Sequence, residues 1–258
     1  MRIAWVVCTY NRPRLLPRVI RCFEQQTYAD RCMLILDDGG QYENQSGNEG
    51  RWQLVSVPNR YSSLGAKRNA SIEIACNRFP GTEAVCPVDD DDLVLPWHTE
   101  ATVTALQQAE WSRPAQVLAP IRGRADWRLV ANYTGHRLDQ RRERLYHPCW
   151  GMRLSAIERG GWYPPHKSGP EDRHLMLEME RRGVTQADYC ELGYPPGYIY
   201  LWTPKISISS FLSAADPDGI EAWKQSEHLL EPATLETWQP PFDLSNPPVT
   251  PGVALRPF

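Results

Sequence analysis

The sequence predicts an α/β fold in which a mostly parallel central sheet is flanked by helices. Apolar runs at residues 3–8, 32–36 and 84–88 have the length and pattern of strands that are buried on both faces. Each run ends in polar residues, and a segment with apolar residues at helical spacing lies between the first two. Strand, helix and strand in this order form the unit from which parallel sheets are built.

The elements of the first half follow in order. A helix is expected from Pro13, which suits a first helical turn, with Asn11 as its N-cap. After the second strand, the polar stretch 41–51, rich in Gly and Asn, predicts a loop. A third strand is expected at residues 52–57, and a helix from Leu64 onward. No GxGxxG follows the first strand, which argues against a dinucleotide-binding fold.

Four consecutive aspartates, residues 89–92, directly follow the apolar run 84–88. They are expected at the carboxyl end of a strand, where open α/β sheets bind their ligands, and Pro96 opens a helix that reaches about Gln108. Adjacent carboxylates repel one another unless a divalent cation lies among them, and oxygen ligands suit Mg²⁺ or Mn²⁺. The alternative is an acidic surface turn, which the apolar flanks disfavour.

The second half begins with a strand and an extended segment, followed by a basic stretch. This stretch is either a solvated loop or a lid over a phosphate-bearing donor or an acidic acceptor. A short aromatic strand, a short helix, a rigid turn, a helix with acidic residues in its first turn and two strands complete the order. The first strand is expected at residues 116–121, the extended segment at 126–133 and the basic stretch at 135–144. The aromatic strand is expected at 146–152, the short helix at 154–159 and the rigid turn at 160–165. The helix with the acidic first turn is expected at 171–182, and the last two strands at 198–202 and 206–211. A proline-rich tail follows from about Pro232.

Composition narrows the class of protein. The chain has 258 residues, of which 41% are hydrophobic, and this suits one large domain with an ample core. A net charge of −3 gives no overall basic field for nucleic acid. No apolar run is long enough to span a membrane, and the apolar N-terminus is too short for a signal peptide. Seven scattered cysteines without a CxxC pair indicate reduced thiols, so we expect a cytoplasmic protein.

Five short motifs point to a family. They read VCTYNRP at residues 7–13, LDDG at 36–39, GAKRNA at 65–70, VDDDDLVLP at 88–96, and GGW with GPED at 160–162 and 169–172. In this order they resemble the inverting family 2 glycosyltransferases, over about residues 3–211. The resemblance implies the GT-A fold, with a Rossmann-like central sheet and a small C-terminal acceptor-side portion. It also implies one catalytic domain at 1–231, with a nucleotide-binding half at about 1–120 and an acceptor-side half at about 121–231, before a tail at 232–258.

Position by position, the resemblance implies a donor site, a metal site and a base. Asp38 would accept a hydrogen bond from a ring N–H of uracil or a similar base. Within the DxD pair, Asp89 would lie near the ribose and Asp91 would bind the cation that bridges the diphosphate, while Asp172 would be the general base. The implied donor-binding residues are Thr9, Tyr10, Asn11, Arg12, Asp38, Lys67, Arg68, Asp89 and Asp90, and the implied ligands of Mn²⁺ or Mg²⁺ are Asp91 and Asp89.

Inverting sugar transfer needs two separate acidic sites. The leaving nucleoside diphosphate gains negative charge, which a bound cation neutralises. The acceptor hydroxyl loses a proton to a carboxylate on the opposite face of the sugar. A metal-bound carboxylate is a poor base, so acidic groups far apart in sequence, such as residues 89–92 and Asp172, fit this division of roles.

The sequence departs from the family pattern in three places. The spacer of DxD is itself Asp90, so the register among the four aspartates is open, although counting back from Pro96 favours Asp91 as the metal ligand. Residues 200–207 lack the late histidine that many GT-A enzymes add to the metal, and nothing in its context marks His228. Lys205 could partly substitute electrostatically. Gly40 stands where the family often has serine.

Four residues are candidates for the acceptor side. Trp162, between two glycines and two prolines, is either a platform for a sugar or a hydrophobic plug under its loop. His147 is either a packed histidine or an acceptor contact beside Trp150, and Glu171 either joins the acceptor site or complements the helix dipole.

The function expected is therefore transfer of a sugar from a nucleotide-diphospho-sugar, with a UDP-sugar favoured, to a hydroxyl. The acceptor is open among a saccharide, a lipid-linked sugar, a protein and a modified nucleic-acid base; the last would rely on the basic stretch 137–144. A nucleotidyltransferase is one alternative, but residues 9–13 are not the Gly- and Lys-rich loop that holds a triphosphate. A non-catalytic sugar- or cation-binding module is another.

Overall fold

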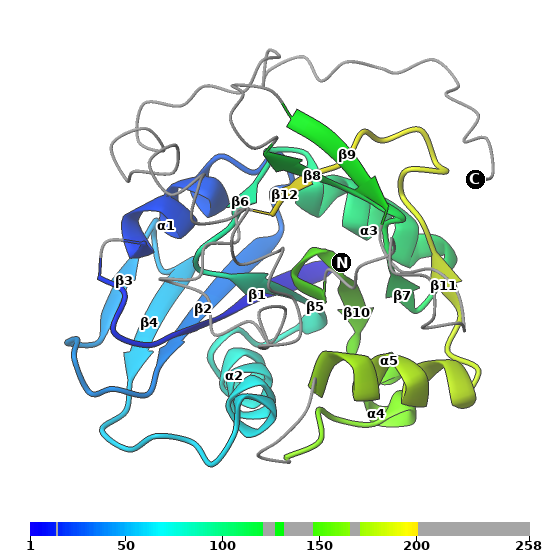
Figure 1. Ribbon diagram of the computed structural model, residues 1–258. Coiled ribbons are helices and arrows are strands. Elements are labelled where there is room, and N and C mark those ends of the chain that lie inside the picture. The colour runs from blue at the N-terminus through cyan, green and yellow to red at the C-terminus, as the bar shows by residue number, and fades with distance from the viewer. Residues whose placement is uncertain (14, 121–126, 132–146, 166–170, 201–258) are drawn as a thin grey trace, which may run out of the picture.

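A computed structural model describes residues 1–13, 15–120, 127–131, 147–165 and 171–200. The central sheet has eight strands, and its middle, β5 to β4, is parallel. Their order is β11 (Gln186–Ala187), β7 (Trp111–Ser112), β10 (Gly151–Arg153), β5 (Thr82–Asp89), β1 (Arg2–Thr9), β2 (Arg31–Asp37), β4 (Trp52–Ser56) and β3 (Gln45–Gly47). The predicted α/β class with a mostly parallel central sheet is therefore confirmed (Figure 1).

Helices cover both faces of this sheet. Figure 1 shows α1 (Leu16–Glu24) and α3 (His98–Gln108) on one face, and α2 (Leu64–Arg78), α4 (Leu154–Gly160) and α5 (Glu171–Arg181) on the other. Trp5 of β1 contacts both α1 and α3. Its ring packs edge-on against Phe23 of α1, with the ring centroids 5.6 Å apart, and its Nε1 donates a 3.1 Å hydrogen bond to Thr99 Oγ1 of α3. The buried apolar runs of β1 and β2 thus form the core between the two helical layers.

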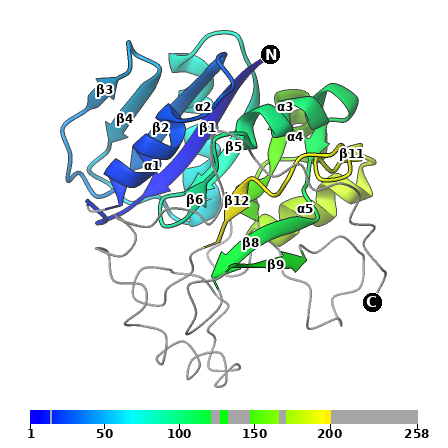
Figure 2. The same cartoon turned by 90° about the horizontal axis from the view of Figure 1, so that it is seen from above.

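A second, four-stranded sheet lies near the carboxyl ends of the central strands (Figure 2). Its order is β6 (Leu93–Val94), β12 (Tyr198–Ile199), β8 (Gln116–Pro120) and β9 (Trp127–Ala131). Only the turn at residues 90–92 separates β6 from β5, so this sheet places β12 directly beside the run of aspartates.

Several local expectations need correction. Asn11 is not an N-cap: it adopts φ +53°, a left-handed conformation that asparagine tolerates, and α1 begins at Leu16 behind Leu15. The expected strand at 146–152 shrinks to β10, because residues 147–149 form a 3₁₀ turn around Pro148, which has no N–H for a ladder. The expected loop 41–51 contains the short edge strand β3.

Other expectations fall outside the described residues. These are the basic stretch 135–144, the strand at 206–211, Lys205, His228 and the tail 232–258. The division into a nucleotide-binding half, an acceptor-side half and a tail stays a prediction. In the part of the chain that the structure describes, no helix is long and apolar enough to cross a membrane.

Candidate active site

The first turn of α2 organises the site. Ser63 caps the helix by accepting a hydrogen bond from the Ala66 backbone N–H at 3.1 Å. The motif residues that follow face three different neighbours: Lys67 faces the ends of β1 and β2, Arg68 faces β5 and α5, and Asn69 faces the loop after α4. This short motif thus contacts Asp38, Asp89, Glu171 and the loop after α4.

Lys67 forms a buried ion pair with Asp38, the residue that directly follows β2. Its ammonium lies 2.6 Å from Asp38 Oδ1 and also donates to the Thr9 carbonyl at 2.5 Å, and both charged side chains are almost fully buried. The other Asp38 oxygen accepts from the Tyr61 backbone N–H at 3.1 Å and lies 3.2 Å from Arg60 Nε. Both oxygens of Asp38 are therefore engaged by groups of the protein.

The Arg60 guanidinium covers the exposed ring of Tyr10, with its central carbon 3.6 Å from the ring centroid. Tyr10 is 39% exposed. A flat aromatic face at the carboxyl end of β1 can stack on a nucleobase, and a stacked guanidinium shows that the face accepts a planar cation. Sequence reasoning singled out Tyr10 but missed Arg60, because nothing in its local pattern distinguishes it from a solvated arginine.

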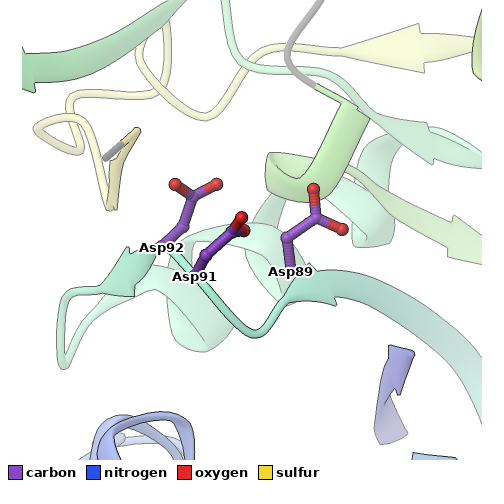
Figure 3. Close-up of side chains that lie close together, drawn as sticks. All are labelled: Asp89, Asp91 and Asp92. Carbon is purple, nitrogen blue, oxygen red and sulfur yellow. The ribbon is translucent and has the colours of Figure 1, made fainter. Parts of the chain in front are cut away.

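The four aspartates divide into one that points inward and three that gather. Asp90 accepts from Thr9 Oγ1 at 2.6 Å and from Arg12 Nη1 at 2.5 Å, and only 1% of it is exposed. The carboxylates of the other three offer oxygens that all lie within 4.8 Å of one another. They are Asp89, Asp91 and Asp92, and Figure 3 shows their side chains projecting from the end of β5 and from the turn that follows it.

Asp92 was not among the expected ligands. Its Oδ2 accepts a 2.5 Å hydrogen bond from the Tyr198 hydroxyl on β12, and its side chain is nearly buried. The pairing of β12 with β6 puts this tyrosine beside the turn. The run of aspartates could have suggested Asp92, but its tyrosine partner lies 106 residues away and carries no local signal.

The charges of this cluster are costly without a cation. Burial raises the pKa of Asp91 to about 7, and Asp89 and Asp90 add to the shift. Burial also raises the pKa of Asp89; Arg68 opposes this shift, and Asp90 and Glu171 reinforce it. Hard oxygen donors that repel one another at this spacing fit a divalent cation such as Mg²⁺ or Mn²⁺. Asp89, Asp91 and Asp92 are the residues that could hold it.

Arg68 lies between this cluster and the acidic pair of α5. Its Nη2 is 3.6 Å from Asp89 Oδ1, and its Nε is 3.4 Å from Glu171 Oε1. Burial alone would lower the pKa of Arg68, but Glu171 and Asp89 outweigh burial and raise it, so the guanidinium stays charged. The structure thus places Arg68 between two carboxylates.

His147 is the third partner of the Arg68 guanidinium. Its ring contacts the Arg68 Nη1 and the Tyr163 hydroxyl, and only 1% of the residue is exposed. Burial and the Arg68 charge hold the pKa of His147 well below its usual range, so the ring is neutral. Since an arginine can only donate, the ring nitrogen that faces it accepts. The His147 ring is thus buried and contacts Arg68 and Tyr163, while a role on the acceptor side stays a prediction.

Asp172 lies in the first turn of α5, as the sequence predicted. Its Oδ1 accepts a 2.7 Å hydrogen bond from the Arg173 backbone N–H. Burial, followed by the neighbouring charge of Glu171, raises the pKa of Asp172 to about 6. A carboxylate that is ionised at neutral pH but still basic can take a proton from a hydroxyl.

The three candidate aromatic residues of the acceptor side differ in exposure. Trp162 is 42% exposed, whereas Trp150 is fully buried against Trp111 and His147, and His147 itself is buried. Two hydrogen bonds between the Asn69 side chain and the Tyr163 backbone, of 2.8 and 2.9 Å, hold the loop that displays Trp162. Of the three, only Trp162 offers a face to a ligand in this arrangement.

The sequence matches no protein-family model and no curated protein. Among solved structures, the fold is similar to S. aureus TarS 1-349 in complex with UDP, at 14% identity and a TM-score of 0.56, over 80% of this chain and 62% of that one. The same TarS fragment in complex with UDP-GlcNAc gives 13% identity, a TM-score of 0.58, and 86% and 64% coverage.

A third similar structure is the mannosyltransferase PcManGT from Pyrobaculum calidifontis in complex with GDP-Man and Mn²⁺. It shares 14% identity with a TM-score of 0.52, over 93% of this chain and 66% of that one. The chain therefore spans less than two thirds of the length of these neighbours. Likeness at this identity concerns the fold, and it confirms the GT-A fold expected from the resemblance. Membership of family 2 and the inverting mechanism stay predictions.

Proposed function

We propose that the chain is a metal-dependent, inverting family 2 glycosyltransferase that moves a sugar from a nucleotide-diphospho-sugar to an acceptor hydroxyl. The observation that carries the proposal is the presence of two acidic sites at the carboxyl edge of the sheet. One is the cluster of Asp89, Asp91 and Asp92, and the other is the pair Glu171 and Asp172 across Arg68. The neighbours with UDP, UDP-GlcNAc, and GDP-Man with Mn²⁺ support a donor of this class.

On the donor side, Mn²⁺ or Mg²⁺ would be held by Asp91 and Asp89, with Asp92 as a further oxygen ligand. When bound, the cation supplies neutralisation of the charge that develops on the leaving diphosphate. Tyr10 would stack on the base, and a UDP-sugar is the favoured donor. Arg60 covers the Tyr10 ring and holds Asp38, so it would have to turn aside before a base could reach either residue.

On the acceptor side, Asp172 would be the general base. Its raised pKa matches that task, because a base works best when its pKa lies near the working pH. Trp162 would offer its exposed face to the acceptor or to the donor sugar. The acceptor hydroxyl belongs to a saccharide, a lipid-linked sugar, a protein or a modified nucleic-acid base.

Calorimetric binding of UDP, GDP, CDP and dTDP, each with Mn²⁺ and then with EDTA, tests the donor half of the proposal. We expect one nucleotide to bind only with metal, and Asp91→Ala to lose that binding while its unfolding transition is kept. A nucleotide that binds identically in EDTA would remove the metal from the proposal. Absence of all nucleotide binding would favour a non-catalytic sugar- or cation-binding module on the same scaffold.

A further inference from the structure

Three nitrogens of one guanidinium face three different partners. Arg68 Nε faces Glu171, Nη1 faces the neutral His147, and Nη2 faces Asp89. The two ion pairs are long, 3.4 and 3.6 Å, and the His147 ring accepts a hydrogen bond from Nη1. The guanidinium is therefore fixed by a neutral histidine and shared loosely by two carboxylates.

We propose that Arg68 is a positioning residue that couples cation binding at Asp89 to Glu171. The inference rests on the proposed function, and it gives Arg68 and Glu171 roles other than direct contact with donor or acceptor. Arg68 is the shared counter-ion of both acidic sites. A cation that binds Asp89 places a like charge beside Arg68, so the guanidinium gives up Asp89 and relies on Glu171.

The surroundings of Arg68 favour a small displacement over release. The side chain is 11% exposed, it lies on the first turns of α2, and its carbon Cζ is 5.6 Å from the Tyr163 ring centroid. The Tyr163 hydroxyl also contacts His147, so the histidine cannot turn away from its place under the guanidinium. Arg68 can therefore move along the line between its two carboxylates while its third contact is kept.

Glu171 then favours cation binding indirectly. With Glu171 present, Arg68 has a second carboxylate to pair with when the cation takes Asp89. With Glu171→Gln, Asp89 is the remaining carboxylate partner of Arg68 among those that the structure places within ion-pair distance. The cation must then compete with a tighter ion pair, and its affinity falls. By linkage, the cation strengthens the Arg68–Glu171 pair by the same factor.

The test is a double-mutant cycle on the full chain, read by calorimetric binding of Mn²⁺ in the presence of UDP. We expect Glu171→Gln to raise the Kd of Mn²⁺ about five- to tenfold in the wild-type background. In the Arg68→Met background the same change is expected to raise Kd by less than about twofold, because no guanidinium remains to compete. Glu178→Gln is the matched control: it makes the same charge change on the same helix, at a carboxylate paired with Arg181 and Arg182 at the surface.

A second measurement covers the case in which Arg68→Met does not fold. In wild type, the side-chain Nε–H resonance of Arg68 is expected to shift on addition of Mg²⁺, as its bond to Glu171 tightens, and Glu171→Gln is expected to abolish the shift. Equal effects of Glu171→Gln on Kd in both backgrounds, or an Nε–H resonance that ignores Mg²⁺, would overturn the coupling alone. Wild type that binds no Mn²⁺ with any of UDP, GDP, CDP and dTDP would overturn the proposed function, and the coupling with it.

Discussion

The Thr9 hydroxyl donates a 2.6 Å hydrogen bond to Asp90 Oδ2 across the boundary between β1 and β5. Arg12 holds the other oxygen of the same carboxylate, so Asp90 cannot turn toward the edge of the sheet. Asp89 and Asp91, on either side of it, gather with Asp92 instead. The end of the neighbouring strand, and not the run of aspartates itself, decides which carboxylates can share a cation.

Thr9→Val tests this relationship, because it keeps the shape of the side chain and removes the donor to a buried carboxylate. We expect the free energy of unfolding to fall by about 1–3 kcal/mol, the usual cost of a buried polar group left without its partner. Urea unfolding measures it. Thr185→Val is the control, since its exposed hydroxyl meets the Glu110 carboxylate at the surface and should cost less than about 0.5 kcal/mol. Equal losses in the two variants would mean that Asp90 does not depend on Thr9.

Asp91→Asn is expected to stabilise the cation-free protein at alkaline pH. The pKa of Asp91 is raised to about 7 in the fold, above its usual value of 3.8, so the native state holds a proton that the unfolded chain has lost. The stability that this provides is complete below the unfolded value and is lost as the pH rises through about 7. In EDTA at about pH 8, the variant should therefore exceed wild type by at least about 1 kcal/mol, and the difference should shrink toward acidic pH.

Chemical unfolding of both proteins across this pH range is the measurement. Added Mn²⁺ at alkaline pH should close or reverse the gap, because a ligand that binds the native state stabilises it and the variant has lost one anionic ligand. A wild type that is the more stable protein in EDTA at every pH would show that the cluster is not repulsive.

Ionisation of Asp172 should set how the reaction rate rises with pH on the acidic side of the pH–rate profile. A base must be ionised to accept a proton, so hydrolysis of the donor, with water as acceptor, is expected to rise with pH and to level off above about 6, the pKa of Asp172. Asp172→Asn should lower the rate about 10²- to 10⁴-fold and leave the Kd of the metal–nucleotide complex within about twofold. Equal loss of rate and of nucleotide binding would remove Asp172 as the base.

Glu171→Gln sharpens this test. Glu171 is a negative neighbour that contributes to the raised pKa of Asp172, so its removal should move the midpoint of the pH–rate profile to lower pH. An unchanged midpoint would indicate that burial alone sets the pKa of the base.

The sequence predicted the parts of the site that follow from local pattern. Continuous apolar runs located β1, β2 and β5, and the polar residues after them lie at one edge because parallel strands end together. The contacts of Arg68 and Asp90 could not be predicted in this way, since their partners, apart from Asp89, lie about 80 to 100 residues away and meet them only through the fold. Asp92 and Arg60 were missed for the same reason: the groups that mark them are Tyr198 and Tyr10.

Gly65, in the first turn of α2, packs closely against the loop after α4 and against Glu171. A Cβ at this position would lie 2.3 Å from the Pro164 carbonyl oxygen and 3.5 Å from the Glu171 Cβ. The absence of a side chain therefore lets the loop that carries Trp162 approach the first turn of α2, where Asn69 holds it. The same close approach brings α2 against the first turn of α5, beside the ion pair of Arg68 and Glu171.

Gly65→Ala places two effects in competition. Alanine favours a helix over glycine by about 1 kcal/mol, so propensity alone predicts a gain. The clash is with backbone, which has no rotamer to change, and overpacking of this kind costs about 1–3 kcal/mol. We therefore expect Gly65→Ala to lower the free energy of unfolding measured in urea. Asn77→Ala, at an exposed position near the end of the same helix, should leave it unchanged or raise it by less than about 0.5 kcal/mol. A gain at Gly65 would mean that the loop can retreat at no cost, and the distance between the acidic sites would then not be set by α2.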